Sequence, residues 1–162
     1  MDGDVAQDRN LSGVSFRVVH GGVDVVKRFV FASDHGLIAA ELARAEADIV
    51  VAGHCGLPFI HRVGSQVWFN PGVIGMPAND GTPDGWYGLI KSEARRVALA
   101  TRRLAYDFQA TARAMLAHGY ANDYAQAIAS GLWPSLDILP AAERSAAGTR
   151  IADCSVLFEL RT

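Results

Sequence analysis

The chain of 162 residues has few cysteines and no long apolar run. Its two cysteines, Cys55 and Cys154, are too few for the disulfide framework of a small secreted domain, so we expect both thiols to be reduced. No apolar stretch approaches the length of a transmembrane helix, which excludes a membrane as partner. The start, Met1-Asp2-Gly3-Asp4, is acidic and unlike a secretory signal. Together these absences predict a cytoplasmic protein.

An excess of one charge is also missing. The sequence has 15 Lys and Arg against 17 Asp and Glu, for a formal net charge of -2. No long basic stripe is present, and this argues against nucleic acid as a partner. Half of the residues are hydrophobic and 20% are charged, which is ordinary for a globular protein. The length fits one domain with a real core.

Strand and helix signals alternate in the first part of the chain. Residues 1–13 are polar and are expected to be loose, whereas 16–20 form a candidate strand. Residues 37–47 are rich in Ala, Leu and Glu and predict a helix. The uninterrupted apolar run 49–52 is typical of a strand covered on both faces. The order strand, helix, strand predicts a layered α/β fold.

Later segments predict hairpins and then helices. Gly64-Ser65 and the segment around residues 92–95 are turn signals between apolar, strand-like runs. Beyond residue 105 the composition becomes helical, and Gly119 and Gly131 are natural helix ends. The expected elements are hairpins at 59–69 and 86–104, helices at 108–118, before Ser130 and at 141–147, and a final strand or arm at 151–160.

Two histidines share one local context. His20 follows a candidate strand and precedes glycine, and His54 follows the apolar run and Gly53. Neighbouring strands of one sheet would bring both imidazoles to the edge where α/β sheets bind ligands. Neutral imidazole is a good ligand for Zn, Mn, Fe or Ni. The alternative is that each histidine ends its strand and forms only local hydrogen bonds.

The order of these motifs resembles the calcineurin-like metallophosphoesterases, and most closely the small bacterial phosphodiesterase-type branch. The resemblance covers about residues 14–105, the back half of such a domain. It rests on four motifs: Val18-Val19-His20-Gly21, Ile49-Val50-Val51-Ala52-Gly53-His54, Leu57-Pro58-Phe59, and Phe69-Asn70-Pro71-Gly72 with Gly75.

The resemblance implies a two-layer α/β sandwich with two divalent metal ions, Mn, Ni, Zn or Fe, and hydrolysis of a phosphate mono- or diester. In this family His20 and His54 would bind the same metal. The family's Asp-x-His and Gly-Asn-His segments are absent, and no strand precedes Gly3-Asp4, so it does not serve as the family's Gly-Asp segment. Gly56 stands where a second histidine is expected. The metal site is therefore incomplete, no catalytic residue is assigned, and the isolated chain is expected to be weak or inactive.

Other candidate residues have simpler interpretations. Cys55 is expected to point away from its neighbour His54. Asp34-His35 is interpreted as a helix cap, and His61 and His118 as structural or exposed residues. The segment 131–135, with Trp133, either covers the site or forms an oligomer contact.

The predicted organisation is a flexible N-terminus at 1–13, the C-terminal half of a metallophosphoesterase-like domain at 14–105, and a helical extension and tail at 106–162. Three functional alternatives stay open. Another chain or a swapped copy in a homo-oligomer could complete the site for a phosphate-ester substrate. The scaffold could instead serve as a non-catalytic binding or regulatory module. The chain could also be a truncated product with an exposed apolar sheet surface.

Overall fold

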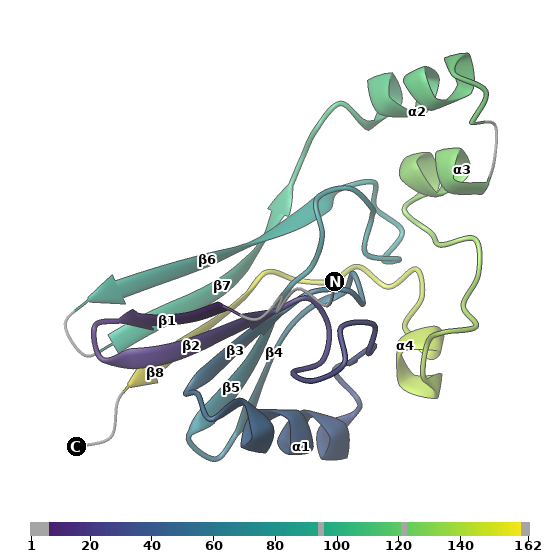
Figure 1. Ribbon diagram of the computed structural model, residues 1–162. Coiled ribbons are helices and arrows are strands. Elements are labelled where there is room, and N and C mark those ends of the chain that lie inside the picture. The colour runs from purple at the N-terminus through teal and green to yellow at the C-terminus, as the bar shows by residue number, and fades with distance from the viewer. Residues whose placement is uncertain (1–6, 94–95, 121–122, 160–162) are drawn as a thin grey trace, which may run out of the picture.

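The computed structural model describes residues 7–93, 96–120 and 123–159 (Figure 1). Within these residues the chain forms two β-sheets and four helices. In chain order the elements are β1 (Gln7–Leu11), β2 (Val14–Val19), α1 (His35–Ala45), β3 (Ile49–Ala52), β4 (Pro58–Val63), β5 (Gln66–Pro71), β6 (Gly85–Glu93), β7 (Arg96–Leu104), α2 (Phe108–Ala117), α3 (Asp123–Ser130), α4 (Ala141–Ser145) and β8 (Cys154–Glu159).

The first sheet has the strand order β1-β2-β3-β5-β4. Its middle strands β2, β3 and β5 are parallel, and β1 and β4 are added antiparallel at the two edges. The second sheet is antiparallel, in the order β6-β7-β8. It covers one face of the first sheet, and α1 covers the other (Figure 1). The predicted α/β sandwich is therefore confirmed.

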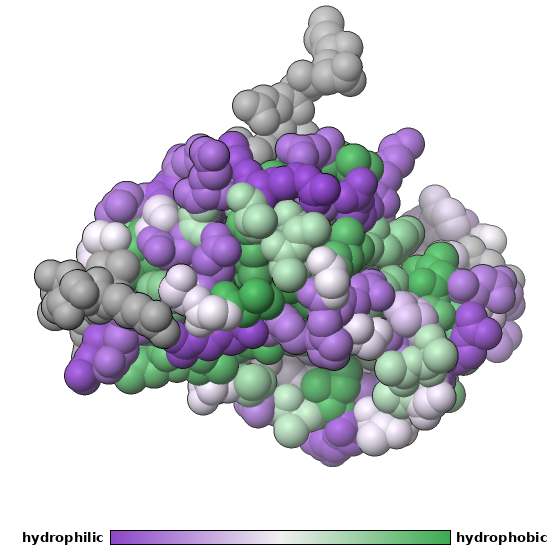
Figure 2. Space-filling view, turned by 90° about the horizontal axis from the view of Figure 1, so that it is seen from below, coloured by the Kyte–Doolittle hydropathy of each residue, from purple (hydrophilic) through white to green (hydrophobic). Residues whose placement is uncertain are grey.

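The sandwich has two apolar cores, because the middle strands are covered on both faces. Neighbouring residues of β3 point to opposite faces, so Ile49 joins the core between the sheets and Val50 joins the core under α1. α1 contributes Ile38 and Leu42 to the second of these cores. Seen from the side of α1, the described surface mixes hydrophilic and hydrophobic residues without one continuous hydrophobic face (Figure 2).

Glu41 of α1 is a fully buried carboxylate. It accepts a hydrogen bond from the Val23 backbone N–H at 2.6 Å, and it forms ion pairs with Arg28 and Arg44. Val23 and Arg28 belong to the long connection between β2 and α1. Since a buried charge is stable only when paired and hydrogen-bonded, Glu41 fixes this connection against the helix.

The expectation of a loose segment at 1–13 is wrong for residues 7–11, while residues 1–6 lie outside the described part. Residues 7–11 form β1, which pairs with β2 from Gln7↔Val18 to Leu11↔Val14. Ser12 and Gly13 both have positive φ, as in the tight turns that suit a hairpin. All five residues of β1 are exposed, so the strand lacks the apolar alternation by which a sequence reveals it.

The last third of the chain first leaves the sandwich, in α2, and returns to it in β8. α2 stands away from the two sheets and has no buried residue (Figure 1). β8 pairs with β7, and Phe158 enters the core between the sheets, so the final segment is a strand rather than an arm. β1 and β8 therefore extend the two sheets beyond residues 14–105. None of the helices in the described residues is long and apolar enough to cross a membrane.

Replacement of Glu41 by alanine is expected to destabilise the protein by about 3 kcal/mol, because it leaves Arg28 and the Val23 N–H without their buried partner. The measurement is the free energy of unfolding in urea. Asp24→Ala is the control, since it removes an exposed carboxylate from the same connection. Equal losses in the two variants would contradict the role given to Glu41.

Candidate functional site

The candidate site begins where two parallel strands end together. β2 and β3 pair up to Val19↔Ala52, and the Gly53 N–H then donates to the His20 carbonyl at 2.9 Å. His20 Nε2 lies 2.9 Å from His54 Nδ1, and the ring centroids are 4.8 Å apart. The prediction that the two imidazoles meet is confirmed. We call them the histidine pair.

The turn that carries His54 is held by Asn70, which is fully buried. Asn70 Nδ2 donates to the Gly53 carbonyl at 3.0 Å and contacts Cys55 Sγ at 3.1 Å. Its Oδ1 accepts from the Gly72 N–H at 3.0 Å. His54 has a φ of 65°, which is costly for a residue with a side chain and persists only where the surroundings impose it. The amide of Asn70 supplies that constraint.

His54 lies in an environment that favours its neutral form. Its ring stacks on Phe29 with centroids 4.2 Å apart, and its Nε2 is buried without a hydrogen-bond partner among the described residues. Burial and the nearby His20 lower the pKa of His54, although the backbone of Lys27 opposes this shift. A neutral imidazole is the form that binds a metal ion.

The histidine pair brings together two nitrogen atoms of the kind that binds divalent metal ions. If the pair held a metal ion, His20 and His54 would each supply one imidazole nitrogen to it. Yet no group of three or more His, Cys, Asp and Glu residues suited to a metal comes together in the described residues. Two imidazole ligands are fewer than the four that close a tight metal site.

Cys55 does not extend this ligand set. Its side chain is 1% exposed, and burial raises the pKa of the thiol to about 12. Metal binding requires the thiolate, so a thiol kept protonated is a poor ligand. Cys55 instead packs with Phe31 and Leu139 in a small apolar cluster. Cys55 and Cys154 are both free thiols, in agreement with the sequence prediction.

Trp133 lies against the position where a second histidine is expected. A Cβ atom on Gly56 would lie 3.3 Å from the Trp133 ring, and the φ of Gly56 is 75°, so a side chain there would be both crowded and strained. Trp133 Nε1 donates to the Pro77 carbonyl at 2.7 Å, and its backbone N–H donates to Asn79 Oδ1 at 2.8 Å. Segment 131–135 therefore covers the site, which is the first of the two roles that the sequence left open for it.

A pocket of about 620 Å³ lies between the histidine pair and this covering segment. We call it the histidine pocket. None of its lining residues is Asp, Glu, Lys or Arg. The residues that line it are His20, Phe29, Gly53, His54, Cys55, Gly56, Gly72, Val73, Met76, Tyr124, Trp133, Pro134, Ser135 and Ile138. No local sequence pattern identifies Phe29, Tyr124 or Ile138, because they meet only through long-range packing.

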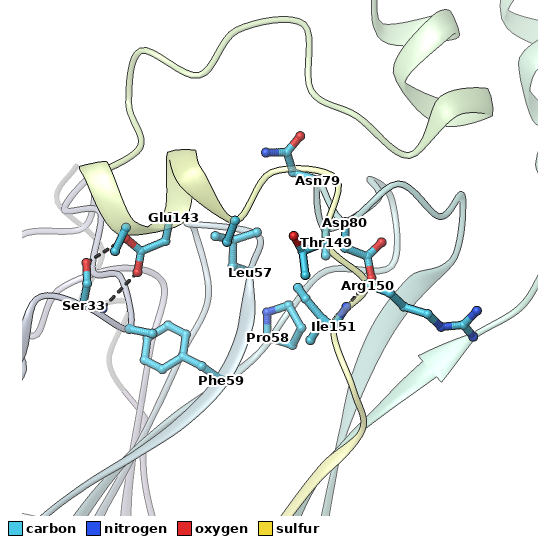
Figure 3. Close-up of a pocket in the computed structure, with 14 residues that line it drawn as sticks. Ser33, Leu57, Pro58, Phe59, Asn79, Asp80, Glu143, Thr149, Arg150 and Ile151 are labelled. Atoms are coloured by element: carbon cyan, nitrogen blue, oxygen red, sulfur yellow. Dashed lines mark hydrogen bonds between the residues drawn. The ribbon is translucent and has the colours of Figure 1, made fainter.

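A second cavity, of about 490 Å³, lies where the C-terminal part meets the start of β4 (Figure 3). Glu143 reaches from α4 to Ser33, whose N–H and hydroxyl donate to the carboxylate at 2.9 and 2.7 Å. The Asp80 carboxylate accepts from Thr82 and Arg103 and from the Ile151 N–H. Both carboxylates are thus engaged in joining the C-terminal part to the sandwich.

The remaining predicted residues do not line the histidine pocket. Asp34 stands at the N-cap position of α1, but its side chain accepts from the Phe31 N–H instead of capping the helix. His35 and His61 form a separate ring pair with centroids 4.9 Å apart, and burial and His35 lower the pKa of His61. His118 is exposed, with Nδ1 at 2.8 Å from the Ala114 carbonyl.

Comparison with solved structures identifies the fold. A metallophosphoesterase from Sphaerobacter thermophilus matches 82% of this chain and 56% of its own, at 20% identity and a TM-score of 0.62. A hypothetical protein from Pyrococcus horikoshii OT3 matches 80% of this chain and 51% of its own, at 12% identity and a TM-score of 0.67. Chaetomium thermophilum Vps29, complexed with a cyclic peptide, matches 64% and 54%, at 14% identity and a TM-score of 0.51.

These similarities show a metallophosphoesterase-type fold, so the predicted resemblance is confirmed for the fold. The chain spans just over half the length of the first two structures. No family model matches the sequence, and no curated protein matches it significantly.

Substitution of Asn70 by alanine is expected to destabilise the protein by about 2 kcal/mol, because it removes the side-chain acceptor of the Gly72 N–H and one of the two hydrogen bonds that the Gly53 carbonyl accepts, the other coming from the Cys55 N–H. The measurements are urea unfolding and the NMR signals of the His54 ring, which should shift as the turn relaxes. Asn10→Ala serves as control, because Asn10 caps an exposed turn through Gly13. An unchanged His54 signal in Asn70→Ala would contradict the account of this turn.

Asp80 is expected to make the free energy of unfolding depend on pH in the acid range. Burial acts to raise its pKa, but hydrogen bonds from Thr82, Arg103 and the Ile151 N–H outweigh burial, and the pKa of Asp80 is lowered from the ordinary 3.8. A group with a lowered folded pKa stabilises the protein above its unfolded pKa, and this contribution disappears as the pH falls through the folded pKa.

The Asp80→Asn variant should therefore be less stable than the original protein at pH 7. It should also lose less stability on acidification from about pH 5 to pH 2, where the unfolded and then the folded carboxyl titrate. Unfolding in urea at several pH values measures both effects. Asp153→Asn is the control for the loss of a carboxylate, because the Asp153 side chain is 48% exposed.

Proposed function

We propose that this chain is the back half of a metallophosphoesterase-type domain, which binds one divalent metal ion weakly and does not hydrolyse phosphate esters by itself. The observation that carries the proposal is the histidine pair, with its two nitrogens 2.9 Å apart and no third ligand among the described residues. Mn, Ni, Zn and Fe suit imidazole ligands. Two ligands fall short of the four that close a tight site.

Each residue of the site has a distinct part in this proposal. His20 and His54 hold the metal ion, Asn70 fixes the turn of His54, and Phe29 supports the His54 ring. A bound metal ion would polarise a phosphoryl oxygen and acidify a bound water. Hydrolysis in this fold would need a second metal ion, and the Asp-x-His and Gly-Asn-His segments from which the resemblance expects its ligands do not occur in these 162 residues. We assign residues 14–105 to the metallophosphoesterase-like half and 106–162 to the extension that covers the site.

A binding role accords with the comparisons. The Vps29 structure contains a bound cyclic peptide, which gives an example of this fold in a protein that binds a peptide. A scaffold that keeps one edge of a metal site can serve as a binding module without catalysis.

A second candidate is an enzyme completed by another chain. Val18 and Ile90 favour it, since they are 38% and 41% exposed although both belong to the inner faces of the sandwich. Val18 lies on the same face of β2 as Phe16, and Ile90 pairs with Leu99 across the second sheet. Phe16 and Leu99 both belong to the core between the sheets. A second chain docked at this open edge could supply the missing carboxylates. This candidate predicts hydrolysis that rises with protein concentration.

Metal titration by calorimetry tests the proposal. The protein should bind Zn²⁺ or Mn²⁺ with one ion per chain, and His20→Ala or His54→Ala should weaken binding by roughly ten- to a hundredfold. His118→Ala is the matched control, because His118 is exposed and apart from the pocket. Unchanged affinity in His20→Ala and His54→Ala would refute the metal site. Turnover of bis(p-nitrophenyl) phosphate at any protein concentration would contradict the proposal that the chain does not hydrolyse phosphate esters. Turnover per chain that rises with protein concentration would establish the second candidate.

A further inference from the structure

We propose that the histidine pocket binds a planar aromatic molecule that carries one anionic group, either a phosphate or a carboxylate. The inference adds a class of ligand to the proposed function. It rests on the proposed function only in using the same two histidines, since the aromatic contacts need no metal ion.

The size and walls of the pocket suit such a ligand. A volume of about 620 Å³ falls within the range of pockets for small molecules, which are mostly apolar with a few polar groups. Phe29, Tyr124 and Trp133 supply three aromatic rings from distant parts of the chain. Phe29 is 37% exposed, Tyr124 51% and Ile138 49%. A cluster of exposed large apolar side chains around a cavity is typical of a binding site.

The Trp133 ring is fixed before any ligand arrives. Its indole N–H and its backbone N–H are both hydrogen-bonded, and Gly56 lies against the ring without a side chain of its own. A rigid aromatic wall loses little entropy when a flat molecule stacks on it. The absence of a side chain at position 56 thus leaves room for a preformed aromatic surface.

The polar end of the pocket favours an anion. The lining contains no Asp or Glu that would repel a negative group, and no Lys or Arg that would attract a polyanion. His20 is exposed, and its Nδ1 has no hydrogen bond to the described residues. The hydrogen bond between the two rings uses His20 Nε2, and one of the two His20 tautomers places a proton on Nδ1. An anionic oxygen beside His20 would select the tautomer with that proton on Nδ1.

The second cavity is a weaker candidate for the same ligand. Its lining contains the Glu143 and Asp80 carboxylates besides Arg150, and Phe59 is its one aromatic residue, so it offers a flat molecule fewer rings to stack on. The histidine pocket, in contrast, is lined by Phe29, Tyr124 and Trp133 and by both histidines of the pair.

Tryptophan indole N–H signals in a ¹H–¹⁵N NMR titration test the inference. The metal-free protein, in EDTA, is titrated with phenyl phosphate, benzoate, phenol and inorganic phosphate. The Trp133 signal should shift and saturate with phenyl phosphate or benzoate, and the better of these two identifies the anionic group. Trp68 and Trp86 are internal controls, because they are 0% and 1% exposed in the cores.

Variants separate the aromatic contacts from the anionic contact. His20→Gln should weaken binding of the aromatic anion roughly tenfold and leave phenol binding unchanged. Ile138→Ala and Phe29→Ala should weaken both ligands. Leu157→Ala, which truncates an equally exposed residue on the second sheet, should change neither.

The inference is overturned by any of three results: an unmoved Trp133 signal, equal binding of inorganic phosphate and phenyl phosphate, or an equal loss of binding in Leu157→Ala and Ile138→Ala. Because the titration is metal-free, a failure of metal binding leaves its result unaffected, and the two proposals can fail separately.

Discussion

The buried amide of Asn70 is the contact on which the site depends. It joins the end of β5 to the turn after β3 through the Gly53 carbonyl and Cys55 Sγ, and it holds its own turn through the Gly72 N–H. The parallel alignment of β2 and β3 brings the strand ends together, but alignment alone does not impose a positive φ on His54. Asn70 supplies this constraint, and the His54 ring consequently faces His20. The motif Asn70-Pro71-Gly72 therefore has a structural role that needs no metal ion.

The C-terminal extension changes what the sheet edge can bind. Glu143 and Asp80 join it to the sandwich through Ser33 and Ile151, and Trp133 then lies beside Gly56. An open edge with two imidazoles becomes a pocket with aromatic walls. The same packing disfavours a histidine at position 56, which would restore the ligand that the resemblance leads one to expect. One contact, Trp133 against Gly56, thus forms the aromatic wall and leaves little room for a side chain at position 56.

The sequence predicts the elements whose patterns are local. The strand, helix and strand around α1, the hairpin turns and the helix end at Gly119 all follow from residues close together in the chain. The meeting of His20 with His54 follows instead from the expectation that their two strands are neighbours in one sheet. β1 escapes prediction because its exposed residues show no apolar alternation. Glu41 resembles any surface glutamate of a helix, since only the connection that folds over it makes it buried. The pocket escapes prediction because residues 29, 124 and 133 meet only in the folded chain.

An anomalous-scattering map of a zinc-soaked crystal tests the central claim most directly, since it locates the metal ion without reference to activity. The account predicts one peak per chain, at about 2.0–2.1 Å from a ring nitrogen of His20 and of His54, beneath the covering segment with Trp133. Two neighbouring peaks would show that the chain builds a dinuclear centre after all. A well-occupied peak away from both histidines, with none between them, would show that the pair is not a metal site.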